Sequence, residues 1–330
     1  MRNRLLPYSV RHPFRAFRRK FPNAYFIFKI ISPAVLTLFI VLLIVSGAIF
    51  YSIIFPQKAP EYIDPGTYKL YAFDFIWDGA NGDTMHGWYI RGSNDAPLIA
   101  LCHGYETNRT EVLSLASLLH DNGYNVFLYN LRGHGRSSYK ISSLGYLEIK
   151  DLDMALKKLY EREEVDYKRI GIWGSSLGAY VALKEAENNK NVRVLVLDSV
   201  YSSIGNFLRI KTSEILGMDS SLITFLVKIY YAIFFKTGFN TINETFNYDK
   251  LKNKKVLFIT GRDPSSYMFA KETRTIYTLF KSKDKEILPL PDSREAILFG
   301  SERRRYDNFV LKFFMKNLPP VVEEIELSTK

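Results

Sequence analysis

An uncharged stretch near the N-terminus divides this 330-residue chain into parts that cannot share one environment. The stretch reads IISPAVLTLFIVLLIVSGAIFYSIIF and covers residues 30–55 without an acidic or basic side chain. As a helix it extends ~39 Å at about 1.5 Å per residue, enough to cross a hydrocarbon core of roughly 30 Å. We therefore predict one transmembrane helix at residues 30–55.

The residues on either side of this stretch suggest an orientation. Residues 1–29 contain eight Lys and Arg side chains and no acid. The positive-inside rule places this basic tail in the cytoplasm and the main domain outside, as in a single-pass membrane protein. We favour an uncleaved signal anchor, because both the charged leader and the apolar run exceed those of a usual secretory signal. A cleaved signal peptide and a buried soluble helix are the alternatives.

Beyond this predicted anchor, the composition is that of a globular protein. Residues 56–66, PQKAPEYIDPG, are rich in Pro and Gly and predict a linker before a domain at residues 67–330. The basic tail supplies eight of the eleven net positive charges, which leaves +3 for the other 301 residues. Nucleic-acid binding is therefore not expected. Cys102 is the only cysteine, so the chain cannot form an intrachain disulfide.

From Tyr68 onward, segments typical of strands alternate with segments typical of helices. Apolar helical spacing occurs near residues 112–119, 152–159, 266–281 and 306–314. Strands are predicted at residues 82–90, 97–104, 124–130, 169–173, 192–197, 254–260 and 285–290. Several are continuous apolar runs, as in strands buried on both faces. The predicted class is α/β, with a mostly parallel central sheet covered by helices and a site at the carboxyl ends of the strands.

One insert breaks the alternation. Residues 201–250 contain SLITFLVKIYYAIFF at positions 221–235, an apolar run interrupted only by Lys228. We interpret the insert as a helical cap over the edge of the sheet. A plain helical packing insert is an equally good interpretation.

Four short motifs follow one another along the predicted strands and loops. They are LCHGY (101–105), YNLRGHGRS (129–137), GSSLG (174–178) and VLFITGRDP (256–264). In this order they resemble the α/β-hydrolase superfamily over about residues 68–318, with the closest resemblance to its membrane-anchored esterase, lipase and serine-aminopeptidase-like members. The second motif usually carries Asp where this chain has Asn130. The resemblance implies the α/β-hydrolase fold and a serine nucleophile.

The third motif identifies that serine as Ser176. A tight turn from strand to helix would strain its backbone, which Gly174 and Gly178 allow because they carry no side chain. The resemblance further implies an oxyanion hole formed by the backbone N–H groups of Leu177 and Tyr105. Alternatively, the glycines serve only the packing of sheet and helix, and Ser176 takes no part in chemistry.

The acid and the base of a catalytic triad are less well defined. Asp263, in TGRDP, is the candidate acid, and Asp198, which ends the run VLVLD, is the alternative. The family's histidine would lie between the last strand and the last helix, yet the chain has no histidine after His134. Near its place stand Ser293 and Arg294, and neither is a base near neutral pH.

His103 is the candidate substitute base, because its strand end should border Ser176, although such a residue usually has a structural role. We expect His134 to brace its own loop, His86 to lie in an early strand, and His120 to lie on the surface. His12 falls in the basic tail. Cys102 is expected to be a small buried residue, since it and His103 point to opposite faces of a strand.

Two functions follow from these residues. The first is a serine hydrolase of esters or amides with an apolar acyl part, in which His103 or water takes the proton and the substrate is hydrophobic or lipid-like. The second is a pseudoenzyme that binds ligands or acts as a scaffold, because loss of one triad member leaves only ~10³–10⁴-fold catalysis over water. No metal-ligand spacing and no phosphate-binding glycine loop occurs, so we predict no metal and no cofactor. The sequence does not identify a protein partner.

Overall fold

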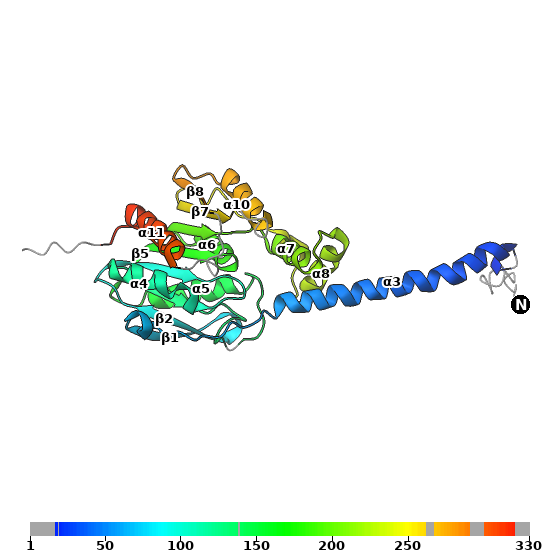
Figure 1. The fold of residues 1–330 in the computed structure, drawn as a ribbon, viewed down its shortest axis with the longest axis horizontal. Helices are drawn as coiled ribbons and strands as arrows, with labels where there is room; N and C mark the ends of the chain where they lie inside the picture. Colours follow the sequence, from blue (N-terminus) through cyan, green and yellow to red (C-terminus); the bar gives the residue numbers. More distant parts are fainter. Residues whose placement is uncertain (1–16, 19, 138, 262–266, 291–299, 321–330) are drawn as a thin grey trace, which may run out of the picture.

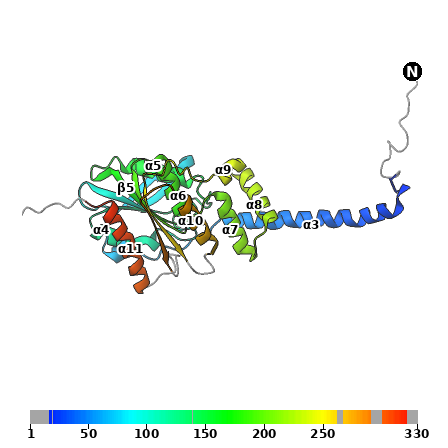
Figure 2. The same cartoon turned by 90° about the horizontal axis from the view of Figure 1, so that it is seen from above.

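A single long helix projects from a mixed α/β domain (Figure 1). The computed structural model describes residues 17–18, 20–137, 139–261, 267–290 and 300–320. The long helix, α3, covers Pro22–Ile54, and Figure 2 shows it extending away from the domain in the second view as well. In the described residues, α3 is the one helix long and apolar enough to cross a membrane, and its position near the N-terminus also fits a signal sequence.

The domain is built on an eight-stranded sheet with the order β1-β2-β4-β3-β5-β6-β7-β8. The strands are β1 (Ala72–Asp78), β2 (Thr84–Ile90), β3 (Ala96–Cys102), β4 (Asn125–Tyr129), β5 (Val165–Ser175), β6 (Val192–Asp198), β7 (Lys255–Gly261) and β8 (Lys285–Leu290). β2 is antiparallel to both β1 and β4, and the remaining neighbours are parallel. This confirms the predicted class, an α/β fold with a mostly parallel central sheet.

Helices cover both faces of this sheet. They are α4 (Leu113–Asp121), α5 (Glu148–Leu159), α6 (Leu177–Asn188), α10 (Tyr267–Leu279) and α11 (Gly300–Asn317), with short 3₁₀ turns η1 (Pro65–Tyr68), η2 (Ala80–Gly82) and η3 (Arg109–Val112). The buried side chains of α5, α6 and α10 belong to one core cluster, and those of α4 and α11 to another. Alternate residues of β3 enter the two clusters, which explains why that strand is apolar throughout.

The insert between β6 and β7 forms three helices, α7 (Ile204–Leu216), α8 (Ser221–Phe234) and α9 (Phe239–Asn243). We call these three helices the cap. Figures 1 and 2 show α7 and α8 beside the part of α3 nearest the domain. The Tyr230 hydroxyl donates to the Leu43 carbonyl at 3.1 Å, and the Phe50 ring lies 5.9 Å from that of Tyr230 and 5.6 Å from that of Phe234. The cap therefore holds the end of α3.

Residues 56–66 are packed against the domain. The Asn108 side chain donates to two carbonyls of this segment, and the Glu61 side chain is only 3% exposed. Glu61 pairs with Arg109 at 3.2 Å and accepts a hydrogen bond from Asn130 at 2.6 Å. Side-chain contacts thus hold this segment against the domain, and we call residues 56–66 the strap.

Candidate active site

The sheet brings two of the predicted motifs to one edge. β3 and β5 are parallel neighbours, with Cys102 opposite Gly174 in the register. The loop that starts at His103 and the turn that carries Ser176 therefore leave the sheet side by side. The cap begins after β6, whose last residue, Asp198, is opposite Ser175, so it rises from this same edge.

Ser176 occupies a strained turn between β5 and α6. Its backbone has φ 50° and ψ −109°, a region that residues with a side chain rarely adopt. Its N–H donates to the Asp198 carbonyl at 2.8 Å, and its carbonyl accepts from the Tyr180 N–H at 3.1 Å. The Ser176 side chain is partly exposed and makes no capping hydrogen bond to α6. The backbone is thus fixed while the hydroxyl is left available.

The two glycines of the turn have steric reasons to be glycine. A Cβ atom at Gly178 would overlap the carbonyl oxygens of Cys102 and His103, and one at Gly174 would overlap the backbone of Gly178. The start of α6 therefore packs directly against the end of β3. This close approach is what brings the Ser176 turn next to the His103 loop.

Two backbone N–H groups near Ser176 are unused. Leu177 is the first residue of α6, and the initial N–H groups of a helix have no partner within it. Neither the Leu177 nor the Tyr105 N–H donates to a backbone acceptor within the described residues. A helix N-terminus also carries a partial positive charge. Within the described part of the chain, both predicted oxyanion donors thus lack a backbone partner.

His103 is buried and both of its ring nitrogens are engaged. Its Nε2 accepts from the Leu131 N–H at 2.9 Å, and its Nδ1 donates to the Gly104 carbonyl at 2.7 Å. Burial lowers the pKa of His103 to about 3, and the neighbouring His134 adds to this shift. The His103 ring thus braces two loops, which agrees with the structural role usual for such a residue. The structure gives no support to a role of His103 as a substitute base.

His134 is also buried and neutral, but it has one free nitrogen. Its Nδ1 donates to the Arg132 carbonyl at 2.8 Å, and burial lowers its pKa to about 4. Its Nε2 has no hydrogen-bond partner among the described residues. The His134 ring lies 5.4 Å from that of His103 and 5.5 Å from that of Tyr105. The expectation that His134 braces its loop agrees with the Arg132 contact.

The candidate acids have different outcomes. Asp263 lies outside the described residues, as do Ser293 and Arg294. Asp198 is fully buried and accepts from the Ser199 hydroxyl at 2.8 Å and from the Tyr306 hydroxyl at 2.9 Å. Burial raises its pKa to about 7. Both Asp198 carboxylate oxygens are thus engaged, and neither accepts from His103 or His134 in the hydrogen bonds of the described residues.

The side chain of Tyr105 connects the site to the cap and to α3, which the sequence did not predict. Its hydroxyl donates to the Ile53 carbonyl at 2.7 Å, near the end of α3. Its ring lies 5.2 Å from that of Phe207 on α7. A loop that presents a predicted oxyanion donor is therefore held by both the cap and the long helix.

The remaining predicted residues lie where expected. His86 is in β2, and His120 is on the surface near the end of α4. Cys102 is fully buried, and burial raises the pKa of its thiol to about 12. Among the described residues, no group of three or more His, Cys, Asp or Glu side chains is placed to hold a metal ion.

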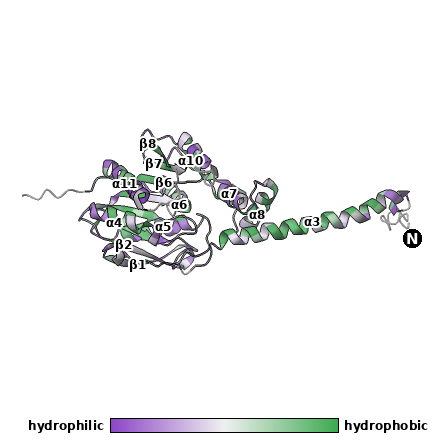
Figure 3. Ribbon diagram, viewed as in Figure 1, coloured by the Kyte–Doolittle hydropathy of each residue, from purple (hydrophilic) through white to green (hydrophobic). Residues whose placement is uncertain are grey.

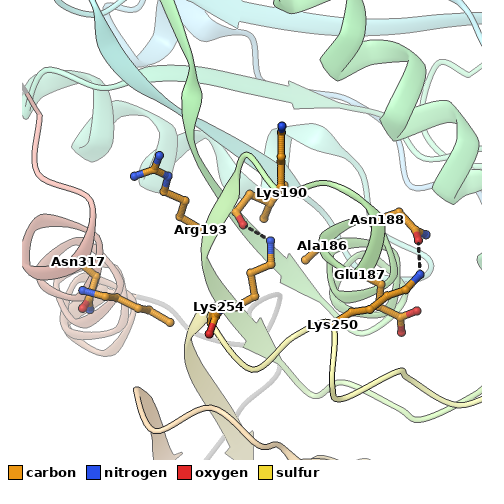
Figure 4. A pocket seen from close by; sticks show the side chains of 11 residues that line it. Ala186, Glu187, Asn188, Lys190, Arg193, Lys250, Lys254 and Asn317 are labelled. Carbon is orange, nitrogen blue, oxygen red and sulfur yellow. Dashed lines mark hydrogen bonds between the residues drawn. The ribbon is translucent and has the colours of Figure 1, made fainter.

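A basic hollow of about 780 Å³ lies at the opposite edge of the sheet (Figure 4). It is lined by residues at the starts of β6 and β7, far from the carboxyl ends where Ser176 lies. Its cations are partly engaged: Lys254 donates to the Asn189 and Val192 carbonyls, and Lys250 donates to Asn188. The hollow is separate from the candidate active site.

Comparison with known proteins agrees with this fold. Residues 93–220 match the family described as serine aminopeptidase, S33. The structure superimposes on the Pyrococcus furiosus esterase Pf2001 with a TM-score of 0.61 and 22% sequence identity, covering 80% of this chain and 99% of that one. The chain thus has the α/β-hydrolase fold.

Similar curated proteins match only in part. The Bacillus subtilis protein YqkD, described as uncharacterized, is 33% identical over 110 residues, which is 33% of this chain and 35% of YqkD. The Arabidopsis thaliana α/β-hydrolase domain-containing protein WAV2 is 29% identical over 159 residues, which is 47% of this chain and 51% of WAV2. The chain spans from about a third to about half of the length of these two relatives.

Proposed function

We propose that the chain is a membrane-anchored serine hydrolase of esters with an apolar acyl part, in which Ser176 is the nucleophile. The observation that carries the proposal is the strained backbone of Ser176, next to two backbone N–H groups that bind no backbone acceptor in the described residues. Strain of this kind persists only where surrounding structure enforces it, and it is typical of reactive sites. The similar Pyrococcus furiosus protein is an esterase by name, which supports an ester as the substrate in this proposal.

In this reaction the Ser176 oxygen attacks the ester carbonyl, and the Leu177 and Tyr105 N–H groups hold the resulting oxyanion. The alcohol leaves with a proton, and water then releases the acid from Ser176. Because both His103 nitrogens are engaged, water is the acceptor of the serine proton in this proposal. The rate is expected to be far below that of a complete triad. Asp263 is the acid of the proposal on its sequence position alone.

The anchor is part of the same proposal. We infer a cytoplasmic tail at residues 1–29, a span at 30–55 and an extracytoplasmic domain from the strap onward. Retention of the span is favoured by its contacts, since Ile49, Ile53 and Ile54 are buried in the domain core. Cleavage before the strap would remove these side chains and expose the apolar surface that they cover.

A pseudoenzyme is the second candidate, and the engaged nitrogens of His103 favour it. In that case the protein would bind a ligand, and Ser176 would not form a covalent bond. The two candidates predict different reactivity toward a fluorophosphonate, which phosphonylates an activated serine. Since α3 and the strap form part of the fold, the full chain in detergent is the appropriate sample.

The test compares fluorophosphonate labelling of the wild type, Ser176→Ala and Ser175→Ala. Ser175 is the matched control, because it is the adjacent serine and lies buried at the end of β5. We expect labelling of the wild type and of Ser175→Ala, and none of Ser176→Ala. Absence of labelling in all three proteins would overturn the hydrolase proposal in favour of the pseudoenzyme.

A further inference from the structure

The apolar cap lies beside α3 and buries side chains near the end of the predicted span. A hydrocarbon core of roughly 30 Å needs about 20 residues of helix. Counted from Ile30, the first residue after the last charge of the tail, 20 residues end at Ile49. The side chains of α3 are largely exposed from Ile31 to Val45, whereas Ser46, Ile49 and Phe50 are buried.

The partner that buries the end of the span is α8. The Tyr230 hydroxyl reaches the Leu43 carbonyl, and the Phe50 ring lies against the rings of Tyr230 and Phe234. Figure 3 shows apolar residues along α3 up to the point where α8 packs beside it. If residues 30–49 occupy the hydrocarbon core, the cap lies at the depth of its outer part.

The outer surface of α8 is suited to that depth. Leu222, Phe225 and Ile233 are 55%, 52% and 71% exposed, respectively. At positions i, i+3 and i+11 they fall on one side of the helix. The Phe225 ring is extended by that of Phe239 on α9, 5.8 Å away. We call Leu222, Phe225, Ile233 and Phe239 the cap stripe.

We propose that the cap stripe is a membrane-binding surface whose partner is the same lipid bilayer that α3 spans. The inference rests on the proposed membrane anchor, and it adds a second, interfacial contact next to that anchor. We choose the bilayer as the partner because the stripe lies mainly on α8, and α8 packs against the last turns of the proposed span. Asp219, in the loop between α7 and α8, pairs with Arg209 on α7, and these charges limit insertion to the headgroup boundary.

This arrangement orients the site toward lipid. The cap rises from the sheet edge that carries Ser176, so a cap seated at the membrane surface brings that edge to the lipid–water boundary. An ester with a long acyl chain would then reach the site from the outer leaflet without crossing water. The basic hollow, at the other edge of the sheet, would face away from the membrane.

The experiment places one reporter at a time on the full chain. Cys102 is fully buried, so an introduced cysteine is the accessible thiol for a fluorescent label. The variants are Phe225→Cys and Ile233→Cys on the stripe and Ile40→Cys on α3. The control is Tyr167→Cys, exposed near the start of β5, at the edge of the sheet opposite Ser176. Each is reconstituted into phosphatidylcholine vesicles with or without nitroxide-labelled acyl chains.

We expect the nitroxide lipid to quench the label at least two-fold at positions 40, 225 and 233 and to leave position 167 unchanged. Quenching at position 40 with none at 225 and 233 would overturn the inference while the anchor stands. Absence of quenching at position 40 would overturn the anchor and the inference with it. Disulfide cross-linking of two chains through position 225 without quenching would assign the stripe to a second copy and reject the lipid. A Ser176→Ala background should give the same pattern, which separates this result from catalysis.

Discussion

The Ser176 turn and the two buried histidines lie at the same edge of the sheet. They differ in whether the side chain is left available or is held by hydrogen bonds and burial. The turn holds a serine in a strained conformation with its hydroxyl uncommitted. His103 and His134 are fully buried and neutral, and each donates Nδ1–H to a backbone carbonyl. One region leaves a hydroxyl available, and the other holds its side chains against loop backbone.

The difference separates two parts of hydrolase chemistry that usually occur together. Binding an oxyanion requires the backbone of β3, β5 and α6, and that backbone is formed by the fold itself. Efficient acceptance of a proton requires a positioned base with a pKa nearer neutral pH, and a buried ring with a pKa of about 3 does not supply one. In the proposed hydrolase, the backbone donors for the oxyanion are thus supplied by the fold, whereas His103 does not supply efficient proton transfer.

The largest effect on stability is expected from Gly178→Ala, which disrupts the packing that fixes the Ser176 turn. The added Cβ overlaps the carbonyl oxygens of Cys102 and His103, so α6 has to move away from β3. Because both obstacles are backbone atoms, we expect the free energy of unfolding to fall by roughly 3 kcal/mol or more. Thermal and denaturant unfolding in detergent measure the change, and fluorophosphonate labelling should be lost with the turn.

A matched glycine substitution makes this prediction specific. At Gly238, before α9, nothing lies within 4 Å of an added Cβ, and φ is −88°. Gly238→Ala should therefore cost less than about 1 kcal/mol and leave labelling intact. Equal destabilisation by the two variants would show that the contact of α6 with β3 is not what fixes the turn.

A smaller effect, dependent on pH, is expected from the histidines. The pKa of His103 is lowered to about 3 in the folded chain, from an ordinary value of 6.5. The unfolded chain therefore binds a proton below pH 6.5 that the folded chain refuses until about pH 3. Its contribution to stability is complete above pH 6.5 and is lost as the pH falls, by roughly 2 kcal/mol at pH 5.

Comparison of variants isolates this contribution, because the raised pKa of Asp198 acts in the opposite direction. His103→Gln keeps one donor and one acceptor, and it should remove one proton's share of the stability loss between pH 6.5 and 4. His120→Gln, at the surface, is the control and should leave the curve unchanged. If the unfolding free energy of His103→Gln depends on pH as that of the wild type does, the buried ring is already protonated at these pH values. The contrast between an available Ser176 hydroxyl and neutral, bracing histidines would then be wrong.

Much of the fold could be predicted because its signals are local. Apolar runs indicated the central strands, and helical spacing indicated the covering helices. The strand–glycine–serine–helix pattern was enough to place Ser176 at the end of β5. β1 was missed, because it is half exposed at the edge of the sheet and pairs only with β2, so its burial is set by tertiary contacts rather than by its own sequence.

The contacts of residues 43–66 could not be predicted for a similar reason. No local sequence pattern around Glu61 indicates that its carboxylate is buried and contacts Arg109 and Asn130. The partners lie about 50 and 70 residues away along the chain, and the pairing exists only once the loops have formed. Asn130, which departs from the family's Asp, donates to Glu61, so the strap supplies a carboxylate to this loop.

The smallest effect is expected from Tyr105→Phe, which tests whether the site depends on backbone or side chains at this loop. The change removes the hydroxyl that donates to the Ile53 carbonyl at 2.7 Å and keeps the ring that contacts Phe207 and His134. Loss of one such hydrogen bond should cost about 1 kcal/mol of unfolding free energy. The oxyanion donor proposed for Tyr105 is its backbone N–H, so fluorophosphonate labelling of Ser176 should continue at nearly the wild-type rate.

Tyr62→Phe, at a ring that is 87% exposed, is the matched control and should change neither the unfolding free energy nor the labelling rate. If Tyr105→Phe abolished labelling as completely as Ser176→Ala, its hydroxyl would belong to the reacting groups, and the contrast between a backbone-built turn and bracing side chains would have to be abandoned.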